Sequence, residues 1–203
     1  GLCNLDCSLR EALSNVSNSD IITFDPSLTG QTIRLTSELL VDKSITIDGS
    51  SLASAITVNG DADNDGDGDV RLMTIASFAD VTINNINFTK GYTSVQLKSG
   101  GLNNLGSLTI NDSTFSENIG NQGGAIRNSG DLTLNHVGFA TNSAPEGGAI
   151  LNDLNATTTI SNSTFNENSA VGQYGTGGAI SNVGNLIITG SEFIENIATL
   201  GGG

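Results

Sequence analysis

Tryptophan is absent from this 203-residue chain, and proline and cysteine occur only twice each. Aromatic residues make up 4% of the sequence, so a core packed around large rings is not expected, and scarce proline excludes a proline-rich or collagen-like chain. No stretch approaches the roughly 20 consecutive apolar residues that a membrane-spanning helix needs. Apolar residues are nevertheless spread over the whole length, between 26 glycines. This distribution predicts a thin and continuous core.

Basic residues are also few, since seven Lys and Arg stand against 21 Asp and Glu, giving a formal net charge of −14. Nucleic acids and anionic lipids are bound through clustered cations, so we expect neither nucleic acid as a partner nor membrane insertion by this segment. The charge suits a salty or calcium-containing medium. Because the sequence does not open with a basic and then an apolar region, we expect any export signal to be removed or to lie upstream.

The only cysteines, Cys3 and Cys7, lie close together near the N-terminus. We favour a disulfide across this short loop, which would imply an oxidising compartment, although two reduced thiols are the open alternative. A metal site is disfavoured, because two thiols lack further ligands and the single His136 is far away in sequence.

Internal repeats are the main signal. Phenylalanines recur with separations of 27, 24, 26 and 28 residues, at Phe88, Phe115, Phe139, Phe165 and Phe193. An aliphatic residue stands five positions before each, and the later four are followed three positions on by Asn118, Asn142, Asn168 and Asn196. A Gly-Gly-Ala-Ile segment begins at Gly123, Gly147 and Gly177. A unit of about 25 residues therefore repeats from about residue 81 to residue 203.

Each unit holds short segments of period-two alternation, such as Leu108-Thr109-Ile110, with Gly, Asn and Asp at the corners between them. We predict an all-β, right-handed parallel β-helix in which each unit forms one coil and equivalent residues stack roughly 4.8 Å apart. Phe should stack on Phe, the Asn after it should form an amide ladder, and the Ala of each Gly-Gly-Ala-Ile should point inward. A β-sandwich, the alternative, would not require the same residue at the same place in every repeat.

The two ends of the chain suggest different roles. Residues 1–20 are predicted to form an N-terminal cap with one short helix, for which Ser8 is the N-cap and Glu11 completes a capping box. The β-helix then occupies residues 21–203. At the C-terminus the chain stops where the next repeat should begin, so we expect a fragment, or a subunit whose uncapped last coil associates with another copy.

The N-terminal hexapeptide Cys7-Ser8-Leu9-Arg10-Glu11-Ala12 resembles the opening signature of the CSLREA-domain proteins. Segments 22–25 and 44–49 are similar to that group's first coils. The Gly-Gly-Ala-Ile and Phe-x-x-Asn repeats resemble those of the chlamydial polymorphic outer-membrane proteins and are shared by many pectin-lyase-like β-helices. The resemblance implies a prokaryotic protein that is secreted or attached to the outer membrane at the cell surface. In the polymorphic proteins such passenger domains act in adhesion.

An acidic segment at 61–69 is the sharpest local feature, with Asp at every second position: Asp61, Asp63, Asp65, Asp67 and Asp69. Alternating carboxylates with interspersed Gly can wrap around Ca²⁺, and the spacing matches the start of an EF-hand loop. It departs at the twelfth position, where Leu72 replaces the bidentate Glu. We therefore predict an isolated structural calcium loop, with a flexible acidic turn as the alternative. Arg71 is expected to form a salt bridge to one of these Asp.

Two classes of function remain open. The seven cations fall in different repeats, and the glutamates of the repeats do not all share one register, so no convergent catalytic site emerges. Glu117, Glu167 and Glu195 each lie two residues after the Phe, and we expect that row to line an exposed turn. His136 occupies a slot filled by Asp112 and Asn162 in other copies and is expected to be a solvated turn residue. We favour a noncatalytic extracellular scaffold or adhesin that presents its faces to a glycan or a surface protein. The alternatives are a polysaccharide lyase or glycosidase and a subunit of an end-to-end filament.

Overall fold

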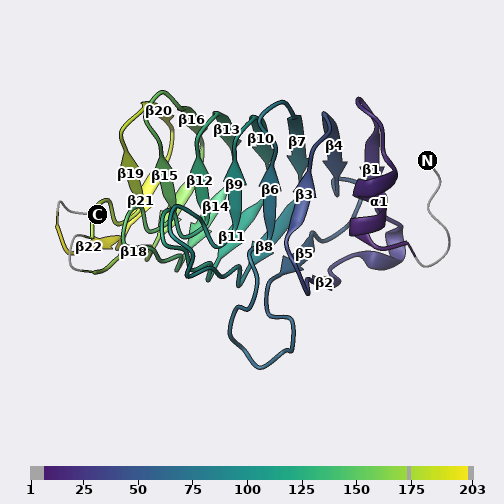
Figure 1. The fold of residues 1–203 in the computed structure, drawn as a ribbon, viewed down its shortest axis with the longest axis horizontal. Helices are drawn as coiled ribbons and strands as arrows, with labels where there is room; N and C mark the ends of the chain where they lie inside the picture. Colours follow the sequence, from purple (N-terminus) through teal and green to yellow (C-terminus); the bar gives the residue numbers. More distant parts are fainter. Residues whose placement is uncertain (1–6, 173–174, 201–203) are drawn as a thin grey trace.

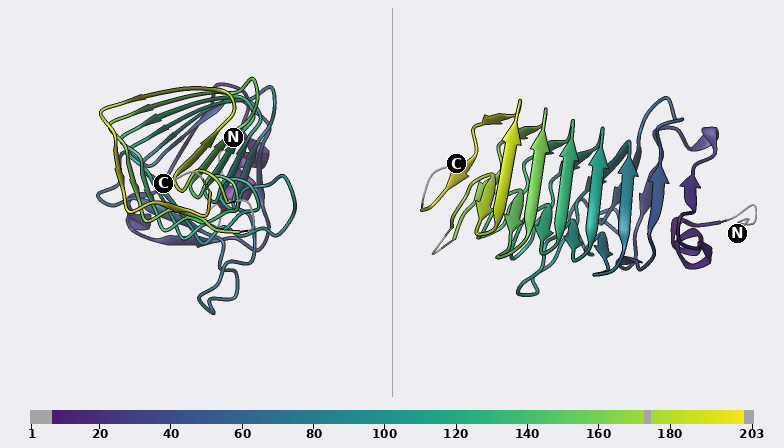
Figure 2. Two further views of the ribbon diagram at one scale, coloured as in Figure 1. Left: turned by 90° about the vertical axis from the view of Figure 1, so that its left-hand side faces the viewer. Right: turned by 90° about the horizontal axis from the view of Figure 1, so that it is seen from above.

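The computed structural model describes residues 7–172 and 175–200. The chain winds into a right-handed, all-β parallel helix of about seven turns with one short helix at its N-terminal end, as predicted (Figure 1). Seen along its axis, the successive coils superpose around one interior (Figure 2).

The α-helix α1 (Leu9–Asn15) covers the first coil of the solenoid (Figure 1). Ser8 is its N-cap, and the predicted capping box is present, because the Ser8 side chain accepts from the Glu11 amide while the Glu11 carboxylate accepts from the Ser8 amide. Leu9 and Leu13 are buried against the core. A short 3₁₀-helix, η1 (Pro26–Leu28), follows β1.

Three parallel sheets run the length of the solenoid, and consecutive strands of one coil belong to different sheets. Sheet A contains β1 (Ile21–Thr23), β4 (Ile45–Asp48), β7 (Asp80–Asn84), β10 (Ser107–Asn111), β13 (Asp131–Asn135), β16 (Thr157–Ser161) and β20 (Asn185–Thr189). Sheet B contains β2 (Thr32–Arg34), β5 (Ile56–Asn59), β8 (Ile86–Thr89), β11 (Thr114–Ser116), β14 (Gly138–Ala140), β17 (Thr164–Asn166) and β21 (Glu192–Ile194). Sheet C contains β3 (Leu39–Val41), β6 (Met73–Ile75), β9 (Leu102–Asn104), β12 (Ile126–Asn128), β15 (Ile150–Asn152) and β19 (Ile180–Asn182). A small pair is formed by β18 (Ser169–Ala170) and β22 (Ile197–Ala198).

Identical positions of successive repeats lie beside one another, so one sequence repeat forms one coil of the solenoid. Phe115 is paired in register with Phe88 and with Phe139. The five phenylalanine rings form one continuous stack whose neighbouring centroids are 4.9, 5.2, 4.7 and 4.7 Å apart. Ala125, Ala149 and Ala179 are buried, as predicted. The narrow interior is therefore filled by rows of like side chains rather than by one globular cluster.

Two amide ladders run parallel to the phenylalanine stack, and both are buried except at their last residue, Asn196 or Asn182. In the Asn118 ladder, the Nδ2 of each residue donates to the Oδ1 of the next at 2.9 Å, through Asn118, Asn142, Asn168 and Asn196. The Asn104 ladder does the same at 2.7 to 2.9 Å through Asn104, Asn128, Asn152 and Asn182. Side-chain amides in these rows satisfy buried polar groups that the turns would otherwise leave unpaired. The first ladder was predicted from the sequence, and the second was not.

The corners between strands depend on left-handed backbone conformations. Between sheets A and B, a residue with φ near +50° recurs at Asn85, Asp112, His136, Asn162 and Gly190, as expected of a solvated turn. A second left-handed turn follows sheet B and uses residue types without that preference: Lys90, Glu117, Thr141, Glu167 and Glu195. The residue types explain the first set of turns, because Asn, Asp and Gly tolerate the left-handed region.

Core residues are more exposed in the last described coil, at the C-terminal end that faces the viewer in the left panel of Figure 2. Phe193 is 44% exposed, whereas Phe165, one coil earlier, is fully buried. Association of further copies through this coil stays a prediction, and light scattering across a concentration range would test it.

Candidate functional site

The acidic loop 61–69 projects from the side of the solenoid between β5 and β6, where it connects sheet B to sheet C (Figure 1). Gly60 closes its base, because the amides of Asp69 and Val70 donate to the Gly60 carbonyl at 2.9 and 3.2 Å. A Cβ at Gly60 or at Gly68 would lie 2.3 or 2.4 Å from the Lys90 carbonyl oxygen. These glycines allow the loop base to contact the next coil directly.

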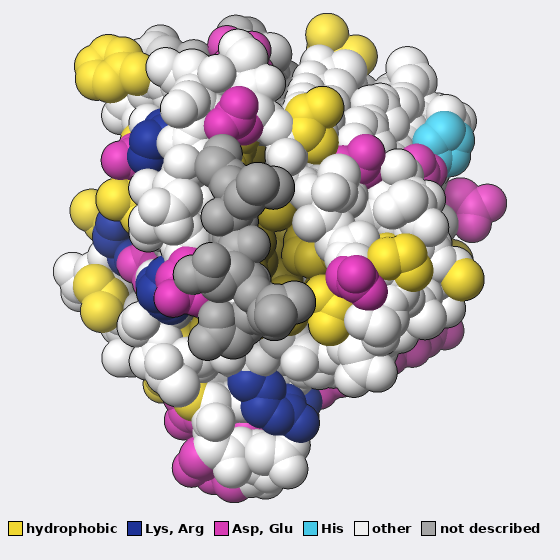
Figure 3. All heavy atoms as spheres, turned by 90° about the vertical axis from the view of Figure 1, so that its right-hand side faces the viewer, with side chains coloured by type: hydrophobic (Ala, Val, Ile, Leu, Met, Phe, Trp, Pro, Cys, Tyr) yellow, Lys and Arg dark blue, Asp and Glu magenta, His cyan; other side chains and the backbone are white. Residues whose placement is uncertain are grey.

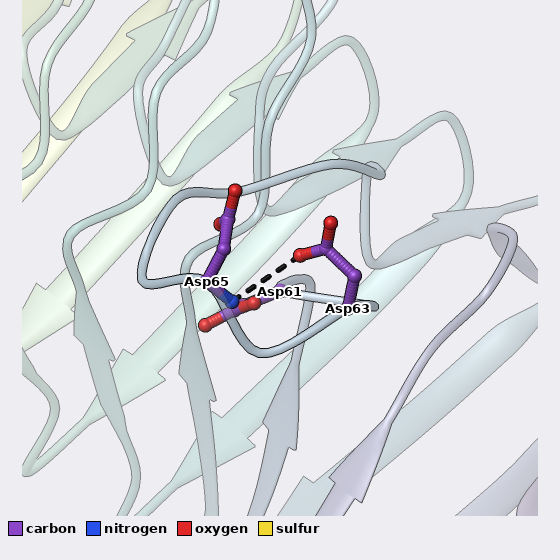
Figure 4. A group of neighbouring side chains, drawn as sticks. All are labelled: Asp61, Asp63 and Asp65. Atoms are coloured by element: carbon purple, nitrogen blue, oxygen red, sulfur yellow. Dashed lines mark hydrogen bonds between the residues drawn. The ribbon is translucent and has the colours of Figure 1, made fainter.

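Three of the five predicted ligands come together. One carboxylate oxygen from each of Asp61, Asp63 and Asp65 lies within 4.8 Å of the other two (Figure 4). Asx turns shape the loop, since the Asp63 side chain accepts from the Asp65 amide at 3.2 Å and Asp65 accepts from the Asp67 amide at 3.0 Å. Asp61 is 2% exposed, while Asp63 and Asp65 are exposed. The cluster therefore has one buried carboxylate at its base and two at the surface.

Asp61 is held as a carboxylate. Its Oδ2 accepts from the Gly66 amide at 3.2 Å and lies 3.4 Å from the Lys90 ammonium. Burial raises the pKa of Asp61, but Lys90 and the amides of Gly66 and Asn64 together lower it below its ordinary value. Its Oδ1 is buried and has no hydrogen-bond partner in the described part of the chain.

Asp67 and Asp69 lie outside this cluster. Asp69 contributes to the loop's shape, because its Oδ2 accepts from the Ala62 amide at 2.7 Å across the loop. On the side of the preceding coil, the Arg34 guanidinium donates to the Asn64 side chain. Figure 3, which faces the N-terminal end, shows acidic side chains on the projection with basic side chains at its base.

The expected salt bridge between Arg71 and the acidic loop is wrong. Arg71 binds Glu38 through two nitrogens, with Nε to Oε1 at 2.8 Å, and Thr74 donates to the same carboxylate. Burial raises the pKa of Glu38, but the hydrogen bonds from Arg71 and Thr74 and the charges of Arg71 and Lys98 lower it overall. Stacking places Arg71 beside a residue 33 positions earlier, although the loop is nearer in sequence.

The remaining candidate residues lie where the sequence placed them. His136 is a solvated turn residue whose Nδ1 is 3.9 Å from an Asp112 oxygen. Glu117, Glu167 and Glu195 share one exposed turn position, spaced by coils. Cys3 lies outside the described residues, so its disulfide with Cys7 stays a prediction. Among the described residues, no helix is long and apolar enough to cross a membrane.

A solenoid of stacked coils with one acidic insertion defines the class of protein to which the chain is similar: parallel β-helix repeat proteins. Within that class, the Chlamydia polymorphic membrane protein repeat matches residues 162–183. This segment contains Phe165, Asn168 and the Gly177-Gly178-Ala179-Ile180 bend. Neither a curated protein nor a solved structure gives a significant match to the chain.

Proposed function

We propose that this chain is a noncatalytic scaffold or adhesin domain on the outer surface of a bacterium. The observation that carries the proposal is the polymorphic-membrane-protein repeat, which covers the part of one coil from the corner before β17 to the turn after β19, between the sheet A strands β16 and β20. The coils before it repeat the same rows of buried residues. A repeated coil presents long side faces at constant spacing, which suits contact with a glycan or a surface protein.

The hexapeptide at 7–12 supports the export part of this proposal through its resemblance to the CSLREA signature, and it includes the N-cap and the first turn of α1. The proposal also includes a structural calcium ion at the acidic loop. The crowded carboxylates of Asp61, Asp63 and Asp65 support that part, because Ca²⁺ is bound by such oxygen ligands.

Two experiments test the proposal. Labelling of intact bacterial cells that carry the gene with a membrane-impermeant reagent should modify the protein, and beads coated with the purified chain should bind host cells or a glycan array. Protection from the reagent would contradict the surface location. Beads that bind neither target would contradict the adhesin function.

The competing function is a polysaccharide lyase or glycosidase. A degradation screen on acidic and neutral glycans, with calcium and with chelator, should yield no new reducing ends and no unsaturated products. Calcium-dependent cleavage of any glycan would replace the scaffold function with an enzymatic one.

A further inference from the structure

The acidic loop carries more negative charge than its surroundings neutralise. Five carboxylates stand in 61–69, and the basic side chains that reach the loop are those of Arg34 and Lys90. Arg34 donates to the neutral Asn64, so in the described structure Lys90 is the cation that contacts a loop carboxylate. Like charges held this close repel one another unless a cation lies between them.

The buried carboxylate of Asp61 gives a second, independent indication of a cation site. Its Oδ1 is buried without a donor, whereas its Oδ2 is satisfied by Gly66 and Lys90. A buried charged acceptor without a partner is unfavourable. The unpaired oxygen belongs to the same residue that meets Asp63 and Asp65 in the cluster.

The spacing of the cluster fits a calcium ion. Because Ca²⁺–oxygen distances reach about 2.6 Å, two oxygens on one ion can be at most about 5.2 Å apart. The three carboxylate oxygens lie within 4.8 Å of one another. The loop's exposed side also leaves room for water ligands, which a calcium shell of about six to eight oxygens requires here.

We propose that Ca²⁺ is bound by the carboxylates of Asp61, Asp63 and Asp65, while Asp67 and Asp69 are not ligands. Lys90 is a positioning residue that holds Oδ2 of Asp61 and leaves Oδ1 for the metal. This inference deepens the calcium part of the proposed function and rests on it.

Calcium at this site would link three successive coils. The loop begins directly after β5, Arg34 at the end of β2 holds it from the preceding coil, and Lys90 directly after β8 holds it from the following one. Ordering the loop therefore stabilises the N-terminal coils and not only the projection itself.

The test compares the chain with two variants that each remove one negative charge from the same loop. Asp61→Asn removes a ligand, and Asp67→Asn is the matched control. We expect calorimetric titration of calcium into the chelator-treated wild-type chain to show one site, and calcium to raise its melting temperature by several degrees. Asp61→Asn should weaken binding by about 100-fold or more, because the loss of even an outer-shell partner costs about 10- to 100-fold. Asp67→Asn should weaken it by less than about tenfold.

Circular dichroism of each variant shows whether it has folded. No heat of binding and an unchanged melting temperature for the wild-type chain would overturn the proposal without depending on any variant. Equal weakening by the two substitutions would overturn the ligand assignment, and an equal response to Mg²⁺ would overturn the assignment to calcium. These failures are distinguishable from failure of the proposed function, because the cell-labelling and bead experiments report on location and adhesion directly.

Discussion

Replacing Asn142 by Ala tests whether the buried amide ladder stabilises the solenoid. Asn142 is fully buried, and its Oδ1 accepts from both the backbone amide and the side chain of Asn118, at 3.1 and 2.9 Å. Its Nδ2 donates to Asn168 at 2.9 Å and to the Phe115 carbonyl at 3.0 Å. The substitution removes all four bonds. Asn168 Oδ1 keeps the Asn142 backbone amide as a donor, so the main loss falls on Asn118.

The magnitude follows from the two donors left on Asn118, which is itself fully buried. Each buried donor without an acceptor costs about 1–3 kcal/mol, so we expect Asn142→Ala to lower the free energy of unfolding by about 4 kcal/mol. Asn135 is the matched control, since it also bonds its neighbours in two coils, Asn111 at 2.8 Å and Ser161 at 2.7 Å, but is partly open to water. Water can replace those partners, so Asn135→Ala should cost about 1 kcal/mol or less.

Urea denaturation followed by far-ultraviolet circular dichroism measures both variants. Asn142→Asp separates hydrogen bonding from loss of volume, because it keeps the side-chain size while placing an acceptor opposite the Asn168 oxygen and the Phe115 carbonyl. At pH 7 it should destabilise the chain at least as much as Ala does. Equal costs for Asn142→Ala and Asn135→Ala, or a neutral Asn142→Asp, would refute the argument from buried hydrogen bonds.

Three further predictions concern single positions. The pKa of Glu38 is lowered in the folded state, so its pairing with Arg71 stabilises the chain above the ordinary Glu pKa, and this contribution is lost as pH falls through the lowered value. Glu38→Gln should therefore lower the free energy of unfolding by about 1 kcal/mol at pH 7 and by little at acidic pH. Urea denaturation midpoints at the two pH values check this prediction. Gly147→Ala should lower the free energy of unfolding by more than about 2 kcal/mol, because φ is +67° and a Cβ would lie 2.1 Å from the Ile150 carbonyl oxygen. A thermal midpoint within about 1–2 °C of the wild-type value would contradict this clash. Gly138→Thr should instead stabilise β14 by about 0.5 kcal/mol in urea denaturation, because a Cβ there meets no atom closer than 3.6 Å and Thr favours strands; a lowered midpoint would show that the strand has no room for it.

The repeat made the coil, the phenylalanine stack and the Asn118 ladder predictable, because identical residues at one spacing must superpose when the chain winds with that period. The Asn104 ladder could have been found in the same way, since its Asn stands two positions after the Ile of each Gly-Gly-Ala-Ile segment.

The sequence predicts a cation-binding loop at 61–69, but it does not predict which of the five carboxylates converge. Alternating Asp residues indicate a cation loop, but which carboxylates converge depends on Asx turns and on the cross-loop bond from the Ala62 amide to Asp69. The predicted partner of Arg71 is wrong because the stacking of coils, and not distance along the chain, places Arg71 beside Glu38. The second left-handed turn gave no signal, because neither Glu117 nor Lys90 has an intrinsic preference for that conformation.

Constant register between coils has a consequence for how such a chain can change in length. Each strand pairs only with its counterparts in the coils on either side, so adding or deleting one whole unit restores every row of buried residues. Extra residues inside a unit must instead leave the solenoid at a turn, as 61–69 do between β5 and β6. Whole-unit duplication therefore lengthens the molecule, while insertions at turns add new surface features without disturbing the coils beneath them.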